Sequence, residues 1–303
     1  YQGHMVALMG RDFGESADLL AAGATPIHAD LRDHQALIAA CAGVDAVIHA
    51  GALSAPWGPQ RDFLAINLGG TAALIAGCRR HRVARLVAIS SPAVVFTGRD
   101  HILTTEAAPY PRRSSSIYAY SKQLAEQLVL AAPDLPTVIL RPKAIFGPGD
   151  RALLPRIIAA ARARRLPQIG HGRNLVDITY VENVAHAISL ALHADAAVGR
   201  VYHITNGEHV ALWELIRALL RRMGLSDRLP RVPLPLMLAA AGAMEARATL
   251  SGREPLLTRY SVAILARTQT YDISAAVHDL GYQPLVSVAE GVERTIARMK
   301  DEG

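Results

Sequence analysis

Cysteine is scarce in this sequence, and no cluster of metal-binding side chains stands out. Cys41 and Cys78 sit in apolar helical segments without C-x-x-C spacing or a nearby pair of histidines. This context is typical of reduced thiols that pack as small hydrophobic groups, so we expect a cytoplasmic protein. His171, His186 and His203 are spaced unlike metal ligands, and we expect no metal site.

Export and membrane signals are also lacking. The chain does not open with a basic segment followed by an apolar one, so no export signal is expected. Its most apolar stretch, residues 232–244, is interrupted by Pro233 and Pro235 and is too short to span a bilayer. We therefore expect no transmembrane segment.

Basic residues outnumber acidic ones, but they form no continuous run. The formal net charge is +6 and the pI is about 9.6, values compatible with a nucleic-acid partner. The arginines are spread over many predicted helices, however, as on solvated helix faces. We expect no nucleic-acid partner, and the positive charge fits an anionic cofactor or a carboxylate substrate equally well.

Short apolar runs alternate with helical segments along the chain. Runs that are apolar along their full length are typical of parallel strands buried on both faces. The alternation predicts an α/β fold, a doubly wound parallel sheet of the Rossmann type. The predicted strands are residues 5–9, 26–28, 46–49, 86–90 and 137–140, and the predicted helices are residues 16–22, 34–41, 62–80 and 118–131.

The pattern becomes less regular after Pro142, with helices predicted near residues 153–165, 212–223 and 236–247. We predict a dinucleotide-binding lobe over residues 1–142, with later strands from about residues 176–206, and a smaller substrate lobe mainly over residues 143–303, interleaved with the first. Residues 236–244 either roof an apolar substrate pocket or form an ordinary buried helix.

One element of a dinucleotide-binding fold has no match at the start of the chain. Such folds begin with a strand, a glycine-rich turn and a helix that holds the pyrophosphate. Gly10 and Gly14 lack the G-x-G-x-x-G spacing and follow what would be the second strand. We expect a gap in the sheet and roughly 20–30 residues ahead of Tyr1 in the native protein. Residues 1–4 could be a cloning remnant, but their direct run into the strand favours native sequence.

A tyrosine and a lysine stand four residues apart at the start of a predicted helix. Tyr118 and Lys122 share one helical face. The ammonium of Lys122 is expected to favour the phenolate and so to lower the pKa of Tyr118 from its ordinary value of about 10. Tyr118 would then be a usable general acid or base. Alone, this spacing is weak evidence, because it is common on helix surfaces.

Serines at a strand end strengthen the catalytic interpretation. Ser90 and Ser91 close the strand 86–90, where the carboxyl end of a strand opens on the crevice. A hydroxyl there could hold a substrate oxygen, or could simply cap a helix. Together with Tyr118, Lys122 and Asn67, the catalytic interpretation is favoured.

With these residues the sequence resembles the extended short-chain dehydrogenase/reductases, within the NAD-dependent epimerase/dehydratase superfamily and its 3β-hydroxysteroid dehydrogenase branch. Within that branch it is most similar to sterol-4α-carboxylate 3-dehydrogenases and bacterial 2-alkyl-3-oxoalkanoate reductases. The resemblance runs from Gly3 to about Arg298, and its specific segments are residues 28–33, 45–49, 90–96, 141–148, 172–183 and 280–285.

The resemblance implies roles for individual residues. Catalysis would fall on Ser91, Tyr118 and Lys122, with Asp30 and Leu31 facing the adenine. Other expected cofactor-binding residues are His49, Ala50, Gly51, Pro142, Tyr118 and Lys122. The expected substrate-binding residues are Ser91, Tyr180 and Trp57, although Trp57 could equally be a loop aromatic packed on the core. The family's glycine fingerprint has no counterpart here.

The cofactor preference depends on the end of the second strand. Arg11, with no acid at Met9 or Gly10, favours NADP(H), because an arginine suits a 2′-phosphate. Asp12 could instead take the ribose hydroxyls, so NAD(H) stays open.

The sequence thus predicts an NAD(P)(H)-dependent oxidoreductase that interconverts a secondary alcohol and a ketone on a hydrophobic substrate, such as a β-hydroxy or β-keto acid or a 3-hydroxysteroid. The alternatives are a nucleotide-sugar epimerase or dehydratase, or a non-catalytic dinucleotide sensor. Sugar-nucleotide relatives usually carry an arginine where Val176 stands, before Asp177. By family analogy, helices 62–80 and 118–131 would pair in a homodimer.

Overall fold

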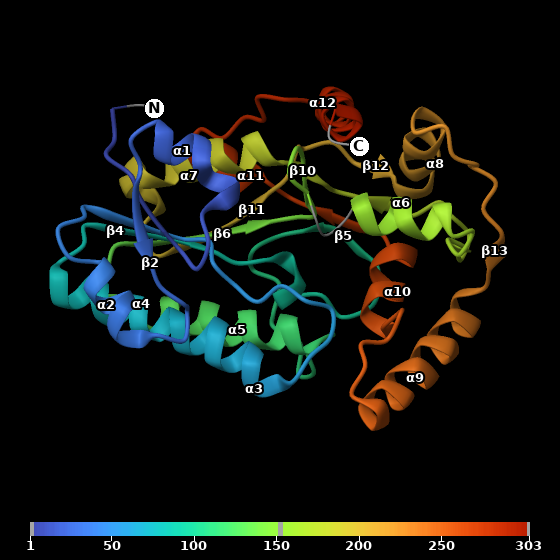
Figure 1. The fold of residues 1–303 in the computed structure, drawn as a ribbon, viewed down its shortest axis with the longest axis horizontal. Coiled ribbons are helices and arrows are strands. Elements are labelled where there is room, and N and C mark those ends of the chain that lie inside the picture. Colours follow the sequence, from blue (N-terminus) through green and yellow to red (C-terminus); the bar gives the residue numbers. More distant parts are fainter. Residues whose placement is uncertain (1–2, 151–153, 302–303) are drawn as a thin grey trace.

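The computed structural model describes residues 3–150 and 154–301, and its centre is a parallel sheet with helices on both faces (Figure 1). Tyr1 and Gln2, which belong to the predicted first lobe, lie outside the described residues, as do residues 151–153 next to a predicted helix. The strands are β1 (Ala7–Gly10), β2 (Thr25–His28), β3 (Ala46–His49), β4 (Arg85–Ile89), β5 (His101–Thr104), β6 (Thr137–Pro142), β7 (Ile145–Phe146), β8 (Gln168–Ile169), β9 (Leu175–Val176), β10 (Thr179–Tyr180), β11 (Arg200–Ile204), β12 (Val210–Ala211), β13 (Arg231–Val232) and β14 (Gln269–Tyr271).

Each predicted helical range contains a helix, although residues 62–80 are divided by a π-helical turn at Leu64–Gly69. The helices over residues 181–193, 259–266, 274–280 and 288–301 were not predicted. The α-helices are α1 (Ala17–Ala21), α2 (His34–Ala40), α3 (Gln60–Phe63), α4 (Gly70–His81), α5 (Ile117–Leu130), α6 (Leu154–Arg162), α7 (Val181–His193), α8 (Leu212–Arg222), α9 (Leu234–Ser251), α10 (Arg259–Ala266), α11 (Ser274–Leu280) and α12 (Val288–Asp301).

The main sheet has parallel strands in the order β11-β6-β4-β3. β4 and β6 are central and buried along almost their whole length, as the apolar runs at residues 86–89 and 138–140 predict. Helices α2, α4 and α5 pack against one face, and α7 and α11 pack against the other (Figure 1). This arrangement confirms the predicted Rossmann-type α/β class.

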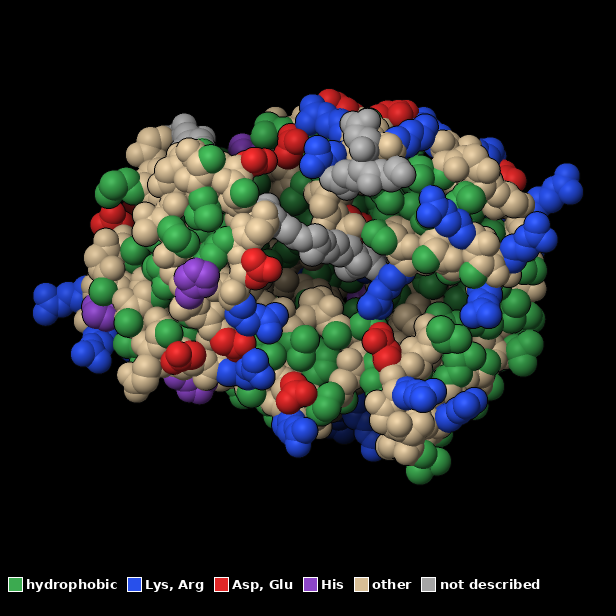
Figure 2. All heavy atoms as spheres, in the orientation of Figure 1, with side chains coloured by type: hydrophobic (Ala, Val, Ile, Leu, Met, Phe, Trp, Pro, Cys, Tyr) green, Lys and Arg blue, Asp and Glu red, His purple; other side chains and the backbone are tan. Residues whose placement is uncertain are grey.

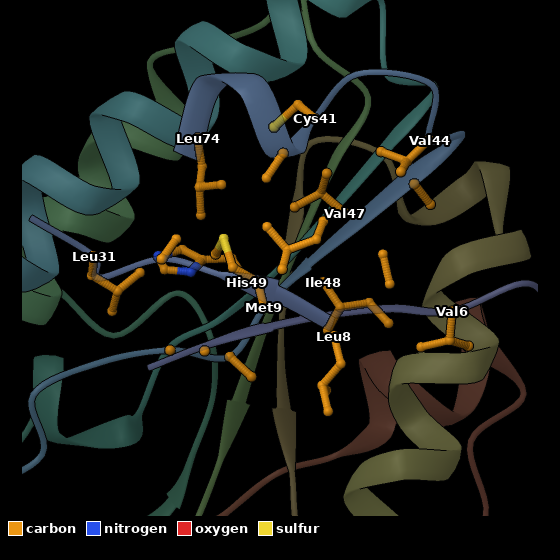
Figure 3. Close-up of a pocket in the computed structure, with 18 of the residues that line it drawn as sticks. Val6, Leu8, Met9, Leu31, Cys41, Val44, Val47, Ile48, His49 and Leu74 are labelled. Atoms are coloured by element: carbon orange, nitrogen blue, oxygen red, sulfur yellow. The ribbon is translucent and has the colours of Figure 1, made fainter. Parts of the chain in front are cut away.

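The sheet is interrupted between β1 and β3. β1 and β2 form a separate parallel pair, and β3 is the outer strand of the main sheet. A cavity of about 550 Å³ lies between them, lined by apolar side chains such as Leu8 and Val47 (Figure 3). Ile48 on β3 is consequently 48% exposed. The interruption lies where the sequence predicts a gap, while the residues expected ahead of Tyr1 stay a prediction.

The later half of the chain builds a smaller lobe beside the main sheet (Figure 1). Trp213 of α8 is fully buried there, in a cluster with Met237 and Ala241 of α9 and Val262 of α10. Residues 236–244 thus contribute Met237 and Ala241 to this core, whereas Leu236 is 61% exposed, and none of them lines the catalytic cavity described below. β14 of the later half pairs with β5 of the first half. The division into two interleaved lobes and its boundary at residue 142 stay predictions.

Among residues 3–150 and 154–301, no helix is long and apolar enough to cross a membrane. The same residues contain no group of three or more His, Cys, Asp and Glu side chains that could hold a metal ion. On the face drawn in Figure 2, Lys and Arg side chains are scattered among other types and do not form one patch. This face offers no continuous basic surface of the kind that nucleic acids require.

Gly77 marks the closest approach of α2 and α4. A Cβ at Gly77 would meet Cys41 Sγ at 2.7 Å and Ile38 Cα at 3.1 Å, so Gly77→Ala must separate the helices. Gly242→Ala in α9 is the matched control, because the nearest atom, Arg259 Cδ, lies 3.8 Å from its Cβ. We expect urea unfolding to show Gly77→Ala less stable than Gly242→Ala by about 1–3 kcal/mol, since both gain helix propensity but only the first is overpacked. Equal stability of the two variants would contradict the close packing.

Candidate active site

A cavity of about 390 Å³ opens at the carboxyl ends of β4 and β6, where this fold class binds its ligands. Its lining includes Ser91, Tyr118 and Lys122, so the structure brings the three predicted catalytic side chains together. Phe96 and Ile264 contribute apolar wall. The cavity therefore combines proton-transferring groups with space for a hydrophobic ligand.

Tyr118 lies in the first turn of α5. Ser116 caps this helix by accepting a hydrogen bond from the amide of Ala119 at 3.0 Å, which determines where the turn begins. Burial raises the pKa of the Tyr118 phenol, although hydrogen bonding with the hydroxyls of Ser91 and Ser54 acts in the opposite direction. The phenol is therefore protonated at neutral pH and can donate its proton.

Lys122 follows one helical turn later, and its ammonium reaches the end of β4. The Nζ atom donates to the carbonyl oxygen of Ile89 at 2.6 Å. Burial lowers the pKa of Lys122 to about 8, while the nearby Glu126 opposes that shift. The expectation that Lys122 lowers the pKa of Tyr118 is wrong for this structure, because burial dominates and raises it.

The two serines at the end of β4 have different partners. The Ser90 hydroxyl donates to Glu126 Oε2 and thus points into the protein. The Ser91 hydroxyl accepts from the amide of Ala93 at 3.2 Å and lies beside Tyr118. Of the two, Ser91 is the one placed to meet a ligand oxygen together with the phenol.

A buried ion pair lies directly behind this site. Glu126 and Arg141 are 3% and 2% exposed. Arg141 Nε donates to Glu126 Oε2 at 3.1 Å and Arg141 Nη2 donates to Oε1. The Tyr110 hydroxyl donates to Oε1 at 2.6 Å, and Ser90 completes the set. The carboxylate of Glu126 therefore ties α5 to β4 and β6.

Asn67 fixes the loop that follows β3. Its side-chain oxygen accepts from the amide of Leu53 at 2.7 Å, and its side-chain nitrogen donates to the Leu53 carbonyl at 3.1 Å and to the Ser121 hydroxyl at 2.8 Å. Asn67 lies in the π-helical turn, and such turns often occur at functional sites. The contacts hold the loop carrying Ser54 against the helix carrying Tyr118.

The cavity between β1 and β3 adjoins the first one, because Ala50 and Ala52 line both. The predicted cofactor-binding residues that it brings together are Arg11, Leu31, His49, Ala50 and Gly51. Figure 3 labels Leu31 and His49 at this cavity. His49 Nε2 lies 2.9 Å from Thr71 Oγ1, and burial lowers the pKa of His49 to about 3, so the ring is neutral.

Only the end of this cavity at the strand ends suits a dinucleotide, because its apolar part between β1 and β3 lies where the sequence predicts a missing strand. A Cβ on Gly51 would lie 3.1 Å from Leu31 Cδ1, so a larger residue there would press on the Leu31 side chain at the edge of the cavity. Among the residues that line this cavity, Arg11 is the cation at the strand ends, where it can pair with an anionic group of the ligand. Pro142, another predicted cofactor residue, lines the catalytic cavity.

The acidic groups near the end of β1 already have hydrogen-bond partners within the protein. Asp30 accepts hydrogen bonds from Arg32 at 2.9 and 2.8 Å, and Arg11 Nη1 lies 3.8 Å from its carboxylate. Arg32 holds the pKa of Asp30 well below its usual range. Asp12 Oδ1 accepts from the amide of Gly14 at 2.9 Å. These contacts leave Arg11 as the charged group that lines the cavity.

Trp57 and Tyr180 line neither cavity. Tyr180 is 1% exposed and packs on Phe146 with ring centroids 5.5 Å apart. Trp57 is partly buried in the loop after β3. Contact of these two residues with substrate stays a prediction that the cavity lining does not support.

Four polar residues of the catalytic cavity were not predicted from the sequence: Ser54, Lys143, Tyr260 and Gln269. Lys143 directly follows Pro142 at the end of β6, so the strand-end rule that indicated Ser90 and Ser91 could have found it. Tyr260 and Gln269 come from the smaller lobe and follow no local pattern.

Comparison with known proteins gives one family. The model of the 3-beta hydroxysteroid dehydrogenase/isomerase family matches residues 14–236. The chain is 39% identical to the 2-alkyl-3-oxoalkanoate reductase of Stenotrophomonas maltophilia (strain K279a), over 97% of this chain and 91% of that protein. It is 36% identical to the decarboxylating sterol-4-alpha-carboxylate 3-dehydrogenase of Mus musculus, over 88% of this chain and 77% of that protein.

A solved structure of DesIV, a dTDP-glucose 4,6-dehydratase from Streptomyces venezuelae with NAD and DAU bound, has a TM-score of 0.77. It covers 98% of this chain and 88% of its own at 23% identity. A likeness at that identity shows the fold alone.

The buried Glu126–Arg141 pair predicts a large stability effect. Glu126→Ala leaves the Arg141 guanidinium buried without its counter-charge, so we expect the free energy of unfolding to fall by about 3–5 kcal/mol in urea titrations. A double variant, Glu126→Leu with Arg141→Met, should recover part of the loss because neither charge remains. As a control, Glu290→Ala breaks the exposed pair with Arg294 and should change stability little. A small effect of Glu126→Ala would contradict the importance of this pair.

Proposed function

The chain belongs to the 3-beta hydroxysteroid dehydrogenase/isomerase family and is an oxidoreductase, and from that premise we propose its substrate, cofactor and catalytic residues. We propose that it reduces the ketone of a 2-alkyl-3-oxoalkanoate with NADPH and runs the reverse oxidation. The supporting observation is the meeting of Ser91, Tyr118 and Lys122 in one partly apolar cavity, next to a second cavity suited to a dinucleotide.

Each catalytic residue has a distinct part in the proposed mechanism. When bound, the nicotinamide supplies the hydride that the carbonyl carbon accepts. The Ser91 hydroxyl orients the carbonyl oxygen, and the protonated Tyr118 gives that oxygen its proton, so that a secondary alcohol forms. Lys122 lies in the same cavity, where its ammonium would bind the nicotinamide ribose, and a proton from water restores the phenol. In sum, ketone, NADPH and one proton yield alcohol and NADP⁺.

Arg11 supports the NADPH preference. It stands at the end of β1 in the dinucleotide cavity, and its neighbouring acids, Asp12 and Asp30, are held by Gly14 and Arg32. A guanidinium in that place can pair with a 2′-phosphate.

A sugar-nucleotide epimerase or dehydratase is less favoured. Val176 is 4% exposed and packs in an apolar cluster, so this position offers no cation to a sugar diphosphate. The homodimer and the cytoplasmic location stay predictions; reduced Cys41 and Cys78 support the second.

Tyr118→Phe removes the proton donor without changing the shape of the ring. We expect kcat for ketone reduction to fall by roughly 10²- to 10⁴-fold in NADPH-absorbance assays. Tyr120→Phe is the matched control, because Tyr120 lies on the same helix, is 39% exposed and is absent from the catalytic cavity lining. Full activity of Tyr118→Phe would overturn the mechanism and revive the non-catalytic sensor.

Arg11→Ala tests the cofactor preference. We expect KM for NADPH to rise by about tenfold while KM for NADH changes little, because only NADPH carries the 2′-phosphate. Arg253→Ala, on an exposed residue after α9, serves as a control for the loss of one positive charge. An equal effect of Arg11→Ala on both cofactors would argue against 2′-phosphate recognition.

A further inference from the structure

Lysine is rare in this chain, and its positions are informative. The sequence contains three lysines, Lys122, Lys143 and Lys300. Lys300 is exposed near the end of α12, whereas Lys122 and Lys143 line the same catalytic cavity. Lys122 belongs to the proposed catalytic residues, whereas Lys143 has no role in the proposed mechanism.

The backbone holds Lys143 rigidly at the cavity. Its amide donates to the Ile204 carbonyl at 3.1 Å, and its carbonyl accepts from Thr179 Oγ1 at 2.7 Å. The next residue, Ala144, has a φ of 44°, a left-handed conformation that is costly for a residue with a Cβ. The chain thus turns sharply just after Lys143, and such strain is often kept at functional sites.

The direct partner of the Lys143 ammonium is neutral. Lys143 Nζ donates to Gln269 Oε1 at 2.7 Å. Gln269 Nε2 donates to the Ile264 carbonyl at 2.9 Å, so the amide must present its oxygen to the lysine. An ammonium has three donors, and this contact uses one of them. The positive charge is oriented by Gln269 but not neutralised by it.

The nearest acid cannot serve as a full counter-ion. Asp177 favours the charged form of Lys143, but Asp177 Oδ1 is paired with His209 Nδ1 at 2.6 Å and Oδ2 accepts from the Tyr271 amide at 2.8 Å. Among the described residues, no carboxylate lies within the 4.0 Å of an ion pair with Lys143. Burial lowers the pKa of Lys143 to about 8, which leaves it mainly protonated at neutral pH.

We propose that Lys143 binds the carboxylate of the substrate, and so selects 3-oxo and 3-hydroxy acids over neutral ketones and alcohols. This inference rests on the proposed function. One carbon separates the carboxylate from the reacting carbon in such acids, so both groups can occupy one cavity of about 390 Å³, with the alkyl chain against Phe96 and Ile264. A bound carboxylate would supply the missing counter-charge.

The test compares an acid with its methyl ester. A 2-alkyl-3-hydroxyalkanoate is suitable because, unlike the 3-oxo acid, it does not lose carbon dioxide spontaneously. KM and kcat for its oxidation with NADP⁺ are measured in the full chain, in Lys143→Met and in Lys300→Met as the control. We expect Lys143→Met to raise KM for the acid by roughly 10- to 100-fold, with KM for the ester changed by less than about threefold. Lys143→Arg should retain part of the affinity because it keeps the charge.

A binding measurement separates this inference from the proposed function. Calorimetry with decanoate and methyl decanoate reports on the carboxylate without any turnover. We expect decanoate to bind the parent protein and Lys300→Met with equal affinity, and to bind Lys143→Met at least tenfold more weakly. If the parent protein oxidises neither hydroxy substrate but Lys143→Met loses decanoate binding, the proposed function fails and the carboxylate site stands.

Three results would overturn the inference. One is an equal rise in KM for the acid and its ester in Lys143→Met, which would indicate a general distortion of the cavity. Another is unchanged affinity of Lys143→Met for both the hydroxy acid and decanoate. The third is a rise in KM for NADP⁺ alone, which would assign Lys143 to the cofactor.

Discussion

The site depends on the ion pair and hydrogen bonds that the carboxylate of Glu126 makes. This carboxylate lies on α5, one turn beyond Lys122, and binds Arg141 from β6, Ser90 from the end of β4, and Tyr110. These bonds set the distance between the helix that carries the phenol and the strand ends that face it. Both charges are almost fully buried. Removing either one would therefore leave the other unpaired in an apolar environment. The helix is therefore locked in register with the sheet, and Tyr118 and Lys122 are held at the cavity.

The rest of the site is arranged around that fixed helix. Asn67 joins the loop after β3 to α5, which brings Ser54 to the phenol. Ala50 and Ala52 of this loop separate the catalytic cavity from the dinucleotide cavity and line both. A ligand in one cavity thus lies next to a ligand in the other, which is the arrangement that hydride transfer requires. The smaller lobe closes the catalytic cavity with Tyr260 and Gln269, and Gln269 orients Lys143.

Much of the site could be predicted because local rules apply to it. A strand that is apolar throughout is buried, and in a doubly wound sheet its carboxyl end faces the ligand, which places Ser91. Side chains four residues apart share a helical face, which places Lys122 beside Tyr118. Tyr180 and Trp57 show where such rules stop. Tyr180 is the last residue of β10, but its ring packs on Phe146 in the core. No rule of spacing indicates into which cavity, or into which core, a loop or strand-end aromatic turns.

The sequence by itself determined the class of fold, the gap between β1 and β3, and the meeting of serine, tyrosine and lysine, because these follow from periodicity and chain order. Only the tertiary structure decided the direction of the pKa shift of Tyr118, since burial outweighs its polar neighbours. It also decided the hydrogen-bond partner of Lys143. That partner, Gln269, lies on β14, which pairs with β5 and is far from Lys143 in the sequence. Desolvation and long-range pairing depend on the whole packed molecule, and no short window of sequence contains that information.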